Sequence, residues 1–294
     1  MSIDTHCHLD FPDFAPDRDA VIRRASEAGV TRLITIGTNL QTSRAAVALA
    51  ETHPNIYATV GIHPCEVAET PEDACDTLEE LAKHPKVVAL GECGLDYHHL
   101  PSRQKSAFAN AAQSTGGVAP GMEESLIADA DLKNRQAIFF QEQLDLAVRL
   151  NLNVVLHQRD SWQDTLATLK PYSSRLRGVF HCFSGTQDQV RQLLELGHAV
   201  SFTGIVTFKN ARDLHECVRQ VPAGSFFVET DCPYLSPEPH RGQRCEPAYT
   251  RLVAEKIASL RGLPLAEIAR ETTAAAEKFS TAAAEKFFRF PSIA

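Results

Sequence analysis

The chain opens with Ser2-Ile3-Asp4-Thr5-His6-Cys7-His8-Leu9-Asp10, which we expect to form the first strand of the fold and to end at Phe11-Pro12. In an extended strand, residues two apart point to the same side, so His6 and His8 can converge on one point. Neutral imidazoles that converge in this way suit a transition-metal ion. A half-buried strand with two incidental histidines gives the same pattern, so the metal hypothesis depends on further ligands at later strand ends.

Strand-like and helix-like segments alternate along the rest of the chain. Short β-branched runs bounded by turns are followed by amphipathic segments, and the middle strands read as near-continuous apolar runs, as strands buried on both faces do. After the opening segment, the predicted strands cover residues 31–37, 56–61, 87–91, 153–156, 178–180, 198–202 and 225–229. Eight such units predict an α/β fold, a parallel (β/α)8 TIM barrel that forms one domain over residues 1–294.

The alternation breaks after the fourth strand. Residues 108–132 contain Ser-Thr-Gly-Gly and Ala-Pro-Gly, and we expect a loop insertion there before a helix from Arg135 to Leu150. Long loops in compact domains are often functional, so the insertion is expected on the rim of the active site. A decoration with no catalytic consequence is the alternative.

The composition is that of a soluble globular protein, with 44% hydrophobic and 22% charged residues. The N-terminus lacks a basic region followed by an apolar run, and no apolar run reaches the roughly 20 residues that span a bilayer. The eight cysteines are scattered and form no C-x-x-C pair, which favours reduced thiols over disulfides or a zinc ribbon. We therefore expect a cytoplasmic protein without a membrane segment.

The net charge of −8 argues against a broad basic surface of the kind that holds nucleic acid through its phosphates. If the protein acts on a polyanion, local side chains and metal ions must supply the attraction. Binding should then be weak without metal.

Six residues with metal-ligand chemistry fall at the ends of predicted strands. They are His6, His8, Glu92, His157, His181 and Asp231. In TIM barrels the active site lies at the C-terminal ends of the strands, so these side chains are expected to meet. The shared position makes a metal site far better supported than any one of these residues alone.

Four imidazoles and two carboxylates are too many for one tetrahedral site that keeps an open position, so we expect two divalent cations bridged by Glu92. The expected division is His6, His8 and Asp231 for one ion, and His157 and His181 for the other. Two ions about 4 Å apart clamp a phosphoryl or carbonyl group and acidify a water. Asp231 is the candidate general base, and Mg, Mn and Zn remain open as the metal.

Longer motifs surround these candidate ligands. They are D-T-H-C-H-L-D (4–10), G-I-H-P (61–64), G-E-C-G-L-D-Y (91–97), L-H-Q-R (156–159), F-H-C-F-S-G (180–185), T-F-K (207–209) and E-T-D-C-P-Y-L (229–235). The motifs resemble the TatD family of metal-dependent hydrolases over Ile3 to about Phe279, apart from the insertion. The resemblance implies a TIM barrel with a divalent-metal site, the same six ligands, and a nuclease that releases nucleotides from the 3′ end of DNA.

The resemblance also implies residues that contact substrate. His63, Arg159 and Lys209 match family positions near the site, and Arg241 and Arg244 lie in a loop after the eighth strand that resembles an arginine run of the family. Arginine suits bidentate contact with phosphate, although each of these side chains could instead brace a loop. Two positions depart from the family pattern, because Cys65 stands where a histidine is usual and Cys245 where an asparagine is usual.

We therefore expect a phosphodiester hydrolase, a deoxyribonuclease of the 3′–5′ exonuclease type with DNA as its substrate and no obligate protein partner evident. No Gly-rich phosphate loop of the Walker type is present, which disfavours phosphoryl transfer from a nucleotide. An ester or amide hydrolase, such as a D-aminoacyl-tRNA deacylase, is the alternative enzyme, because the same ions would polarise a carbonyl. A non-catalytic nucleic-acid-binding or scaffold protein is opposed by the intact ligand set and by the acidic net charge.

Overall fold

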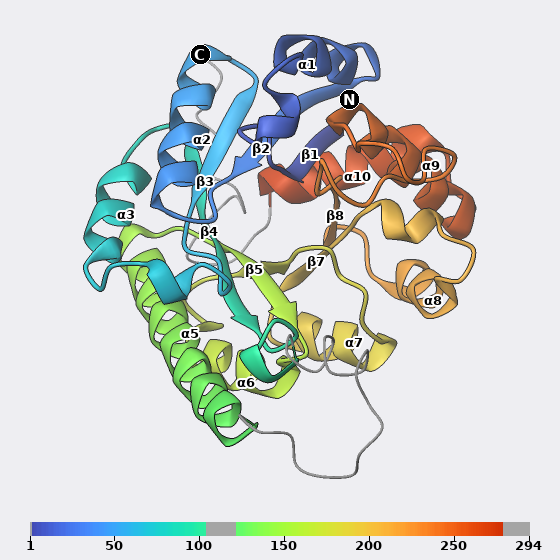
Figure 1. Ribbon diagram of the computed structural model, residues 1–294. Helices are drawn as coiled ribbons and strands as arrows, with labels where there is room; N and C mark the ends of the chain where they lie inside the picture. Colours follow the sequence, from blue (N-terminus) through green and yellow to red (C-terminus); the bar gives the residue numbers. More distant parts are fainter. Residues whose placement is uncertain (1, 104–121, 279–294) are drawn as a thin grey trace, which may run out of the picture.

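The computed structural model describes residues 2–103 and 122–278 of the chain. Eight parallel strands follow one another around one sheet in chain order, as Figure 1 shows. They are β1 (Ser2–Cys7), β2 (Val30–Ile36), β3 (Ile56–Val60), β4 (Val87–Asp96), β5 (Val154–Arg159), β6 (Gly178–Phe180), β7 (Ala199–Phe202) and β8 (Phe226–Val228). An isolated parallel bridge between Cys7 and Cys232 joins the two ends of the sheet, so the barrel is nearly closed. The predicted TIM barrel is confirmed.

The helices surround this barrel (Figure 1). They are α1 (Arg18–Glu27), α2 (Leu40–Thr52), α3 (Ala74–Ala82), α5 (Met122–Leu150), α6 (Trp162–Leu169), α7 (Gln187–Glu195), α8 (Arg212–Gln220), α9 (Thr250–Arg261) and α10 (Leu265–Lys278). α1 buries Val21, Ile22 and Ala25, as its 3.6-residue pattern predicts. α10 packs against β1, β8 and α9, at the point where the sheet closes.

Two hydrophobic layers hold the strands in place. One fills the inside of the barrel with branched and small side chains, among them Ile34, Val88, Val155 and Val179. The other lies between the sheet and the helices and contains most of the remaining buried apolar residues. Burial on both faces explains why the middle strands read as continuous apolar runs.

The predicted insertion over residues 108–132 is wrong in its second part, because α5 begins at Met122 and includes residues 122–132. The stretch from 122 onward has no Gly or Pro and is rich in helix-forming residues, so it extends the helix expected from Arg135. Asp129, in this first part of α5, accepts hydrogen bonds from the backbone N–H and the hydroxyl of Ser102. These bonds connect the helix to the segment that follows β4. Residues 108–121 of the predicted insertion lie outside the described residues.

β4 is longer than expected and places Glu92 inside a strand rather than after it. It pairs with β5 as far as the partners Asp96 and Arg159. Gly94 has φ +139° and lies against the backbone of His157, so a side chain there would collide with the carbonyl of His157. This close approach brings Glu92 and His157 to the same end of the barrel.

All eight cysteines carry free thiols. Within residues 2–103 and 122–278, no helix is long and apolar enough to cross a bilayer.

The buried imidazole of His198 makes the stability of the fold depend on pH. Its Nδ1 accepts the backbone N–H of Gly178 at 2.9 Å, and its Nε2 lies 2.9 Å from the hydroxyl oxygen of Ser173. Burial, helped by the charge of Arg177, lowers the pKa of His198 from 6.5 to about 4. Between these two pH values the unfolded chain binds a proton here that the folded chain does not, so stability falls as the pH is lowered.

Urea unfolding at pH 7 and pH 4.5 should therefore show a loss of free energy of unfolding to which His198 contributes on the order of 2 kcal/mol. The variant His198→Asn keeps an acceptor for Gly178 but has no proton to gain, so it should lose less stability over the same range. An equal loss in both proteins would contradict this assignment. Half-buried His84, on the loop before β4, serves as the control in His84→Asn.

Candidate metal centre

The six ligands predicted from the strand ends meet at one end of the barrel. His6 is in β1 and His8 follows it, Glu92 is in β4 and His157 in β5. His181 follows β6 and Asp231 follows β8. The structure therefore brings together all six residues.

Glu92 is the centre of the cluster and is almost completely buried. Its Oε2 lies 3.3 Å from Nε2 of His6. Its Oε1 lies 2.7 Å from Nε2 of His181, 2.9 Å from Nδ1 of His157 and 3.4 Å from Nε2 of His63. The two oxygens of one carboxylate therefore face two different sets of imidazoles, which is the geometry that a bridging ligand needs.

His6, His8 and Asp231 form the group on one side of Glu92. Oδ1 of Asp231 lies 3.3 Å from Nε2 of His8 and 3.6 Å from Nε2 of His6. The three residues have ligand atoms within 4.8 Å of one another, as do His6, Glu92 and His181 and also His63, Glu92 and His157. Asp231 has φ +58°, a left-handed conformation that is uncommon outside glycine and that places its carboxylate at the cluster.

The residues fit divalent cations. Nε2 of His6, which faces Glu92 and Asp231, is buried and makes no hydrogen bond to any described residue. Buried polar atoms are normally satisfied, and a metal ion satisfies imidazole nitrogens of this kind. The donor set of imidazole nitrogens and carboxylate oxygens suits Zn, Mn and related ions.

The electrostatics of the cluster also favour positive charge. Burial alone would raise the pKa of Glu92, but the imidazoles of His181, His63 and His6 outweigh it and hold that pKa well below its usual range. Burial lowers the pKa of His181, but the charge and hydrogen bond of Glu92 raise it to about 10. A carboxylate that attracts protons to its imidazole neighbours will attract a divalent cation in their place.

Two acidic residues support the ligands and were not singled out from the sequence as site residues. Oδ2 of Asp96 lies 3.0 Å from Nε2 of His157, on the ring edge opposite Glu92, and fixes the orientation of that imidazole. Oε1 of Glu229 lies 3.8 Å from Nδ1 of His181 and accepts the backbone N–H of Cys182. Asp96 is two and four residues from Gly94 and Glu92 in one strand, so the two-residue period could have revealed it.

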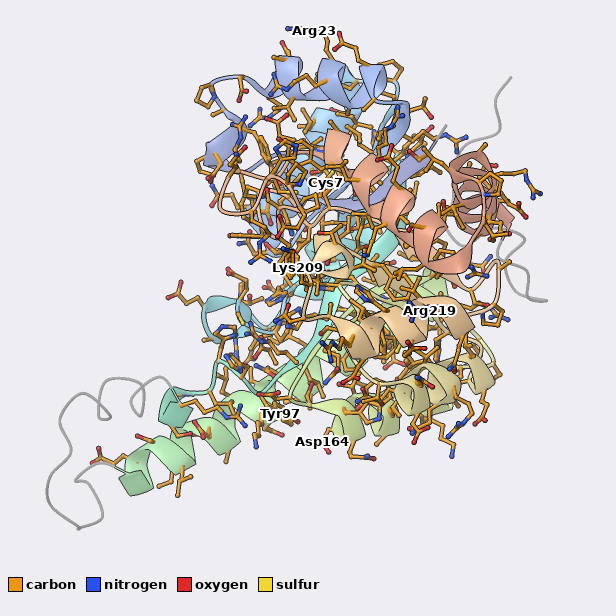
Figure 2. The ribbon with its side chains drawn as sticks, turned by 90° about the vertical axis from the view of Figure 1, so that its right-hand side faces the viewer. Cys7, Arg23, Tyr97, Asp164, Lys209 and Arg219 are labelled. Atoms are coloured by element: carbon orange, nitrogen blue, oxygen red, sulfur yellow. The ribbon has the colours of Figure 1, made fainter. Side chains whose placement is uncertain are left out.

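The residues predicted to contact substrate fall into different surroundings. His63 belongs to the group of candidate ligands around Glu92, because its Nε2 lies 3.4 Å from Oε1 of Glu92. Arg159 ends β5 and is exposed, and Lys209 is exposed after the 3-10 turn Gly204–Thr207 (Figure 2). Arg241 is exposed, and its guanidinium stacks 3.5 Å from the centre of the Phe208 ring.

Arg244 is placed differently from the expectation that it contacts phosphate. Its guanidinium makes two bonds of 2.8 Å to the carboxylate of Asp17, one of 3.0 Å to Glu246 and one of 2.6 Å to the carbonyl of Asp13. Hydrogen bonds from Arg244 and Arg24 lower the pKa of Asp17 to about 2. Phosphate could bind Arg244 only by displacing these partners, so the structure favours the loop-bracing alternative.

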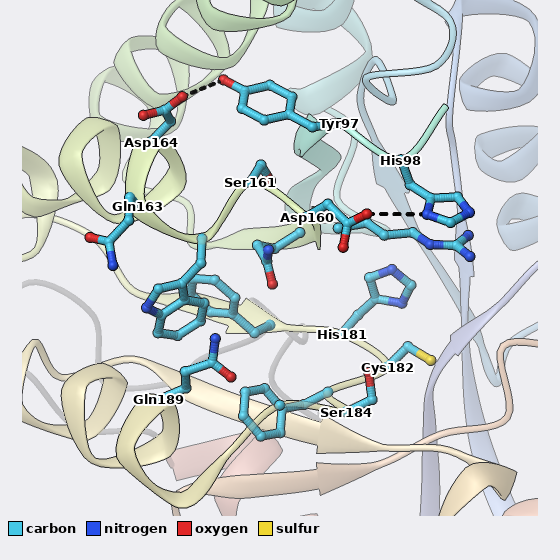
Figure 3. Close-up of a pocket in the computed structure, with 16 residues that line it drawn as sticks. Tyr97, His98, Asp160, Ser161, Gln163, Asp164, His181, Cys182, Ser184 and Gln189 are labelled. Carbon is cyan, nitrogen blue, oxygen red and sulfur yellow. Dashed lines mark hydrogen bonds and ion pairs between the residues drawn. The ribbon is translucent and has the colours of Figure 1, made fainter. Parts of the chain in front are cut away.

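A cavity of about 730 Å³ opens beside His181 (Figure 3). His181 and Cys182 line one part of it, and Tyr97 lines another, where its hydroxyl donates to Asp164 at 2.7 Å. Its other walls include Arg159, Trp162 and Phe180. The cavity therefore places a cation and aromatic residues beside His181.

Comparisons with known proteins show which family the chain is similar to. The family model of the TatD related DNase matches residues 3–280. An uncharacterized metal-dependent hydrolase YabD of Bacillus subtilis is 35% identical over 279 residues, which cover 95% of this chain and 98% of the relative. A 3′-5′ ssDNA/RNA exonuclease TatD of Erwinia tasmaniensis is 33% identical over 282 residues, which cover 94% of this chain and 98% of the relative.

A solved structure shows the same architecture. The crystal structure of YJJV, a TatD homologue from Escherichia coli K12, superposes with a TM-score of 0.78 at 29% identity, over 93% of this chain and 95% of that one. A family match over nearly the whole chain, relatives above 30% identity and a shared fold confirm the resemblance seen in the motifs. The chain belongs to the TatD-related DNase family.

Proposed function

We propose that this protein is a metal-dependent 3′–5′ exonuclease that hydrolyses phosphodiester bonds of single-stranded DNA. Its two divalent ions would be held by six residues, which are His6, His8, Glu92, His157, His181 and Asp231. The observation that carries the proposal is the position of Glu92, whose two oxygens face His6 on one side and His157 and His181 on the other. The exonuclease name of relatives at 33% identity supports the choice of substrate.

Ions bound at this cluster would neutralise charge on a phosphate and acidify a water. The chain's own residues do the rest. Asp231 accepts the proton of the attacking water, and 15% of its side chain is exposed, so that water can reach it. Burial would raise the pKa of Asp231, but the hydrogen bond of His8 and the charges of His6 and His181 outweigh it and keep the carboxylate ionised at neutral pH.

The cavity next to His181 is the proposed site of the terminal nucleotide. Half-buried Trp162 in its wall offers ring surface to a base, and such stacking accepts any base. Arg159 is the cation in the same cavity that could contact a phosphate or the 3′ end. Lys209 and Arg241 are exposed and are proposed as outer contacts to the strand.

The test uses metal-stripped protein and a single-stranded DNA oligomer labelled at its 3′ end or at its 5′ end. Mg, Mn and Zn are added in turn, and His6→Ala is assayed beside the wild type. We expect the 3′ label to be released first as mononucleotide, only with metal, and not by the variant. Intact DNA under every metal would reject the substrate, and aminoacyl esters would be assayed next.

Arg159→Ala should raise KM for the oligomer about 10-fold with a smaller change in kcat, because one charge-assisted contact contributes about 1.5 kcal/mol. Its salt dependence should also be shallower, since one phosphate contact is lost. The matched control is Arg251→Ala, which removes an exposed arginine of α9 that pairs with Glu255. Equal KM in wild type and Arg159→Ala would remove Arg159 from the substrate site.

A further inference from the structure

Three side chains on the rim of the barrel form a second possible ligand set. They are Cys65 in the loop after β3, Asp96 at the end of β4 and His99 just beyond it. Oδ2 of Asp96 lies 2.8 Å from Nδ1 of His99 and 3.7 Å from Sγ of Cys65. Sγ of Cys65 lies 3.8 Å from Nδ1 of His99, which completes the triangle.

These spacings match a tetrahedral ion. With a Zn–S bond of about 2.3 Å and Zn–N and Zn–O bonds of about 2.0 Å, two ligand atoms are about 3.5 Å apart. The two sulfur distances are already close to this value, and the contact between Asp96 and His99 must open when an ion replaces the hydrogen between them. Thiolate, imidazole and carboxylate are together the ligands of a zinc-class ion, and not of Mg²⁺.

We propose that Cys65, Asp96 and His99 bind a zinc-class divalent ion at the rim, outside the cluster around Glu92. Among residues 2–103 and 122–278, these three side chains are the ligands of the rim site. The carboxylate of Asp96 is buried while Cys65 and the side chain of His99, which is 46% exposed, face solvent, so an ion can enter from the rim. The proposal does not depend on which substrate the inner site hydrolyses.

One imidazole connects the rim set to the inner cluster. His157 has Nδ1 at 2.9 Å from Glu92 and Nε2 at 3.0 Å from Oδ2 of Asp96. The other oxygen of Asp96 accepts the backbone N–H groups of His98 and His99 at 2.8 and 2.9 Å. Asp96 is therefore held rigidly, and Oδ2 has one lone pair for His157 and one for the ion.

A second cysteine-containing group does not have this character. Asp4, Cys7 and Cys232 also have ligand atoms near one another, but both oxygens of Asp4 accept hydrogen bonds from Thr230, at 3.0 and 2.6 Å. The thiol of Cys7 donates to the carbonyl of Ile34 at 3.2 Å. These three side chains are fully buried, and Asp4 and Cys7 already have hydrogen-bond partners in the protein, so the group connects β1 to the segment after β8.

The test is a titration of metal-stripped protein with Co²⁺, which replaces zinc and gives a charge-transfer absorption when a thiolate binds it. The readouts are this absorption and the equivalents of metal bound per chain, measured by mass spectrometry. We expect the absorption in the wild type and in His6→Ala. We expect Cys65→Ser to lose it together with one equivalent of metal, and Cys65→His to recover the equivalent without the absorption.

The matched control is Cys75→Ser. Cys75 is a partly buried thiol that, like Cys65, lies beside a carboxylate, with its Sγ 3.6 Å from Glu142, and it is outside the rim set. Cys75→Ser should behave as the wild type does. The proposal is overturned if the wild type shows no thiolate absorption, or if that absorption and the metal equivalents persist in Cys65→Ser.

Discussion

Glu92→Gln is expected to lose hydrolysis by more than about 1,000-fold and to bind less metal than the wild type. The side chain keeps its size, but a neutral amide cannot bridge two cations, and the charge stabilisation that such a pair supplies is worth several kcal/mol. The measurements are the rate of 3′ label release and the metal content after dialysis. Activity and metal content should fall together, because in this account the variant removes a ligand shared by two ions and not a contact to substrate.

The control for this variant is Glu66→Gln, which neutralises an exposed carboxylate that accepts from the side chain of Asn39 at 3.0 Å. It should keep wild-type activity and metal content. Full metal content with normal activity in Glu92→Gln would rule out the bridging role. A circular dichroism spectrum of each variant separates loss of the site from loss of the fold.

Asp231→Asn is expected to lower kcat by roughly 100-fold to 10,000-fold while KM changes little, as for removal of a general base. The asparagine oxygen can still lie beside His8, but the amide cannot accept a proton at neutral pH. Oligomer hydrolysis over a range of pH provides the measurement. The acidic limb of the wild-type profile, which reports proton uptake by the base, should be absent from the residual activity of the variant.

Asp188→Asn is the matched control, because Asp188 is an exposed residue of α7 that pairs with Arg191. It should leave kcat and the pH profile unchanged. A kcat for Asp231→Asn within a few fold of the wild type would show that Asp231 is a ligand only, and another group would have to take the proton.

The meeting of the six candidate ligands was predictable because a parallel barrel places all strand ends on one rim. His6 and His8 share a side of one strand, and each later ligand follows a recognisable apolar run, so local patterns and topology together specify the site. The expectation that side chains at strand ends meet also brought Glu92 to the same end of the barrel as His6 and His181, although β4 continues to Asp96. The continuation to Asp96 follows from pairing with β5.

Contacts between distant loops were not predictable in the same way. The rim set joins Cys65 to His99 across two loops, and only the fold brings their side chains together. Arg244 was predicted to contact phosphate because it lies in a basic loop after the eighth strand. In the structure its guanidinium forms an ion pair with Asp17, which is more than 200 residues away in the sequence. Ion pairs between such distant residues leave no periodic signal in the sequence.

The most direct test of the central claim is anomalous diffraction from crystals loaded with Mn²⁺. We predict two anomalous peaks about 4 Å apart, one on each side of the Glu92 carboxylate. One peak should be bounded by His6, His8 and Asp231, and the other by His157 and His181. A single peak at saturating Mn²⁺, or two peaks that do not share Glu92, would contradict the account.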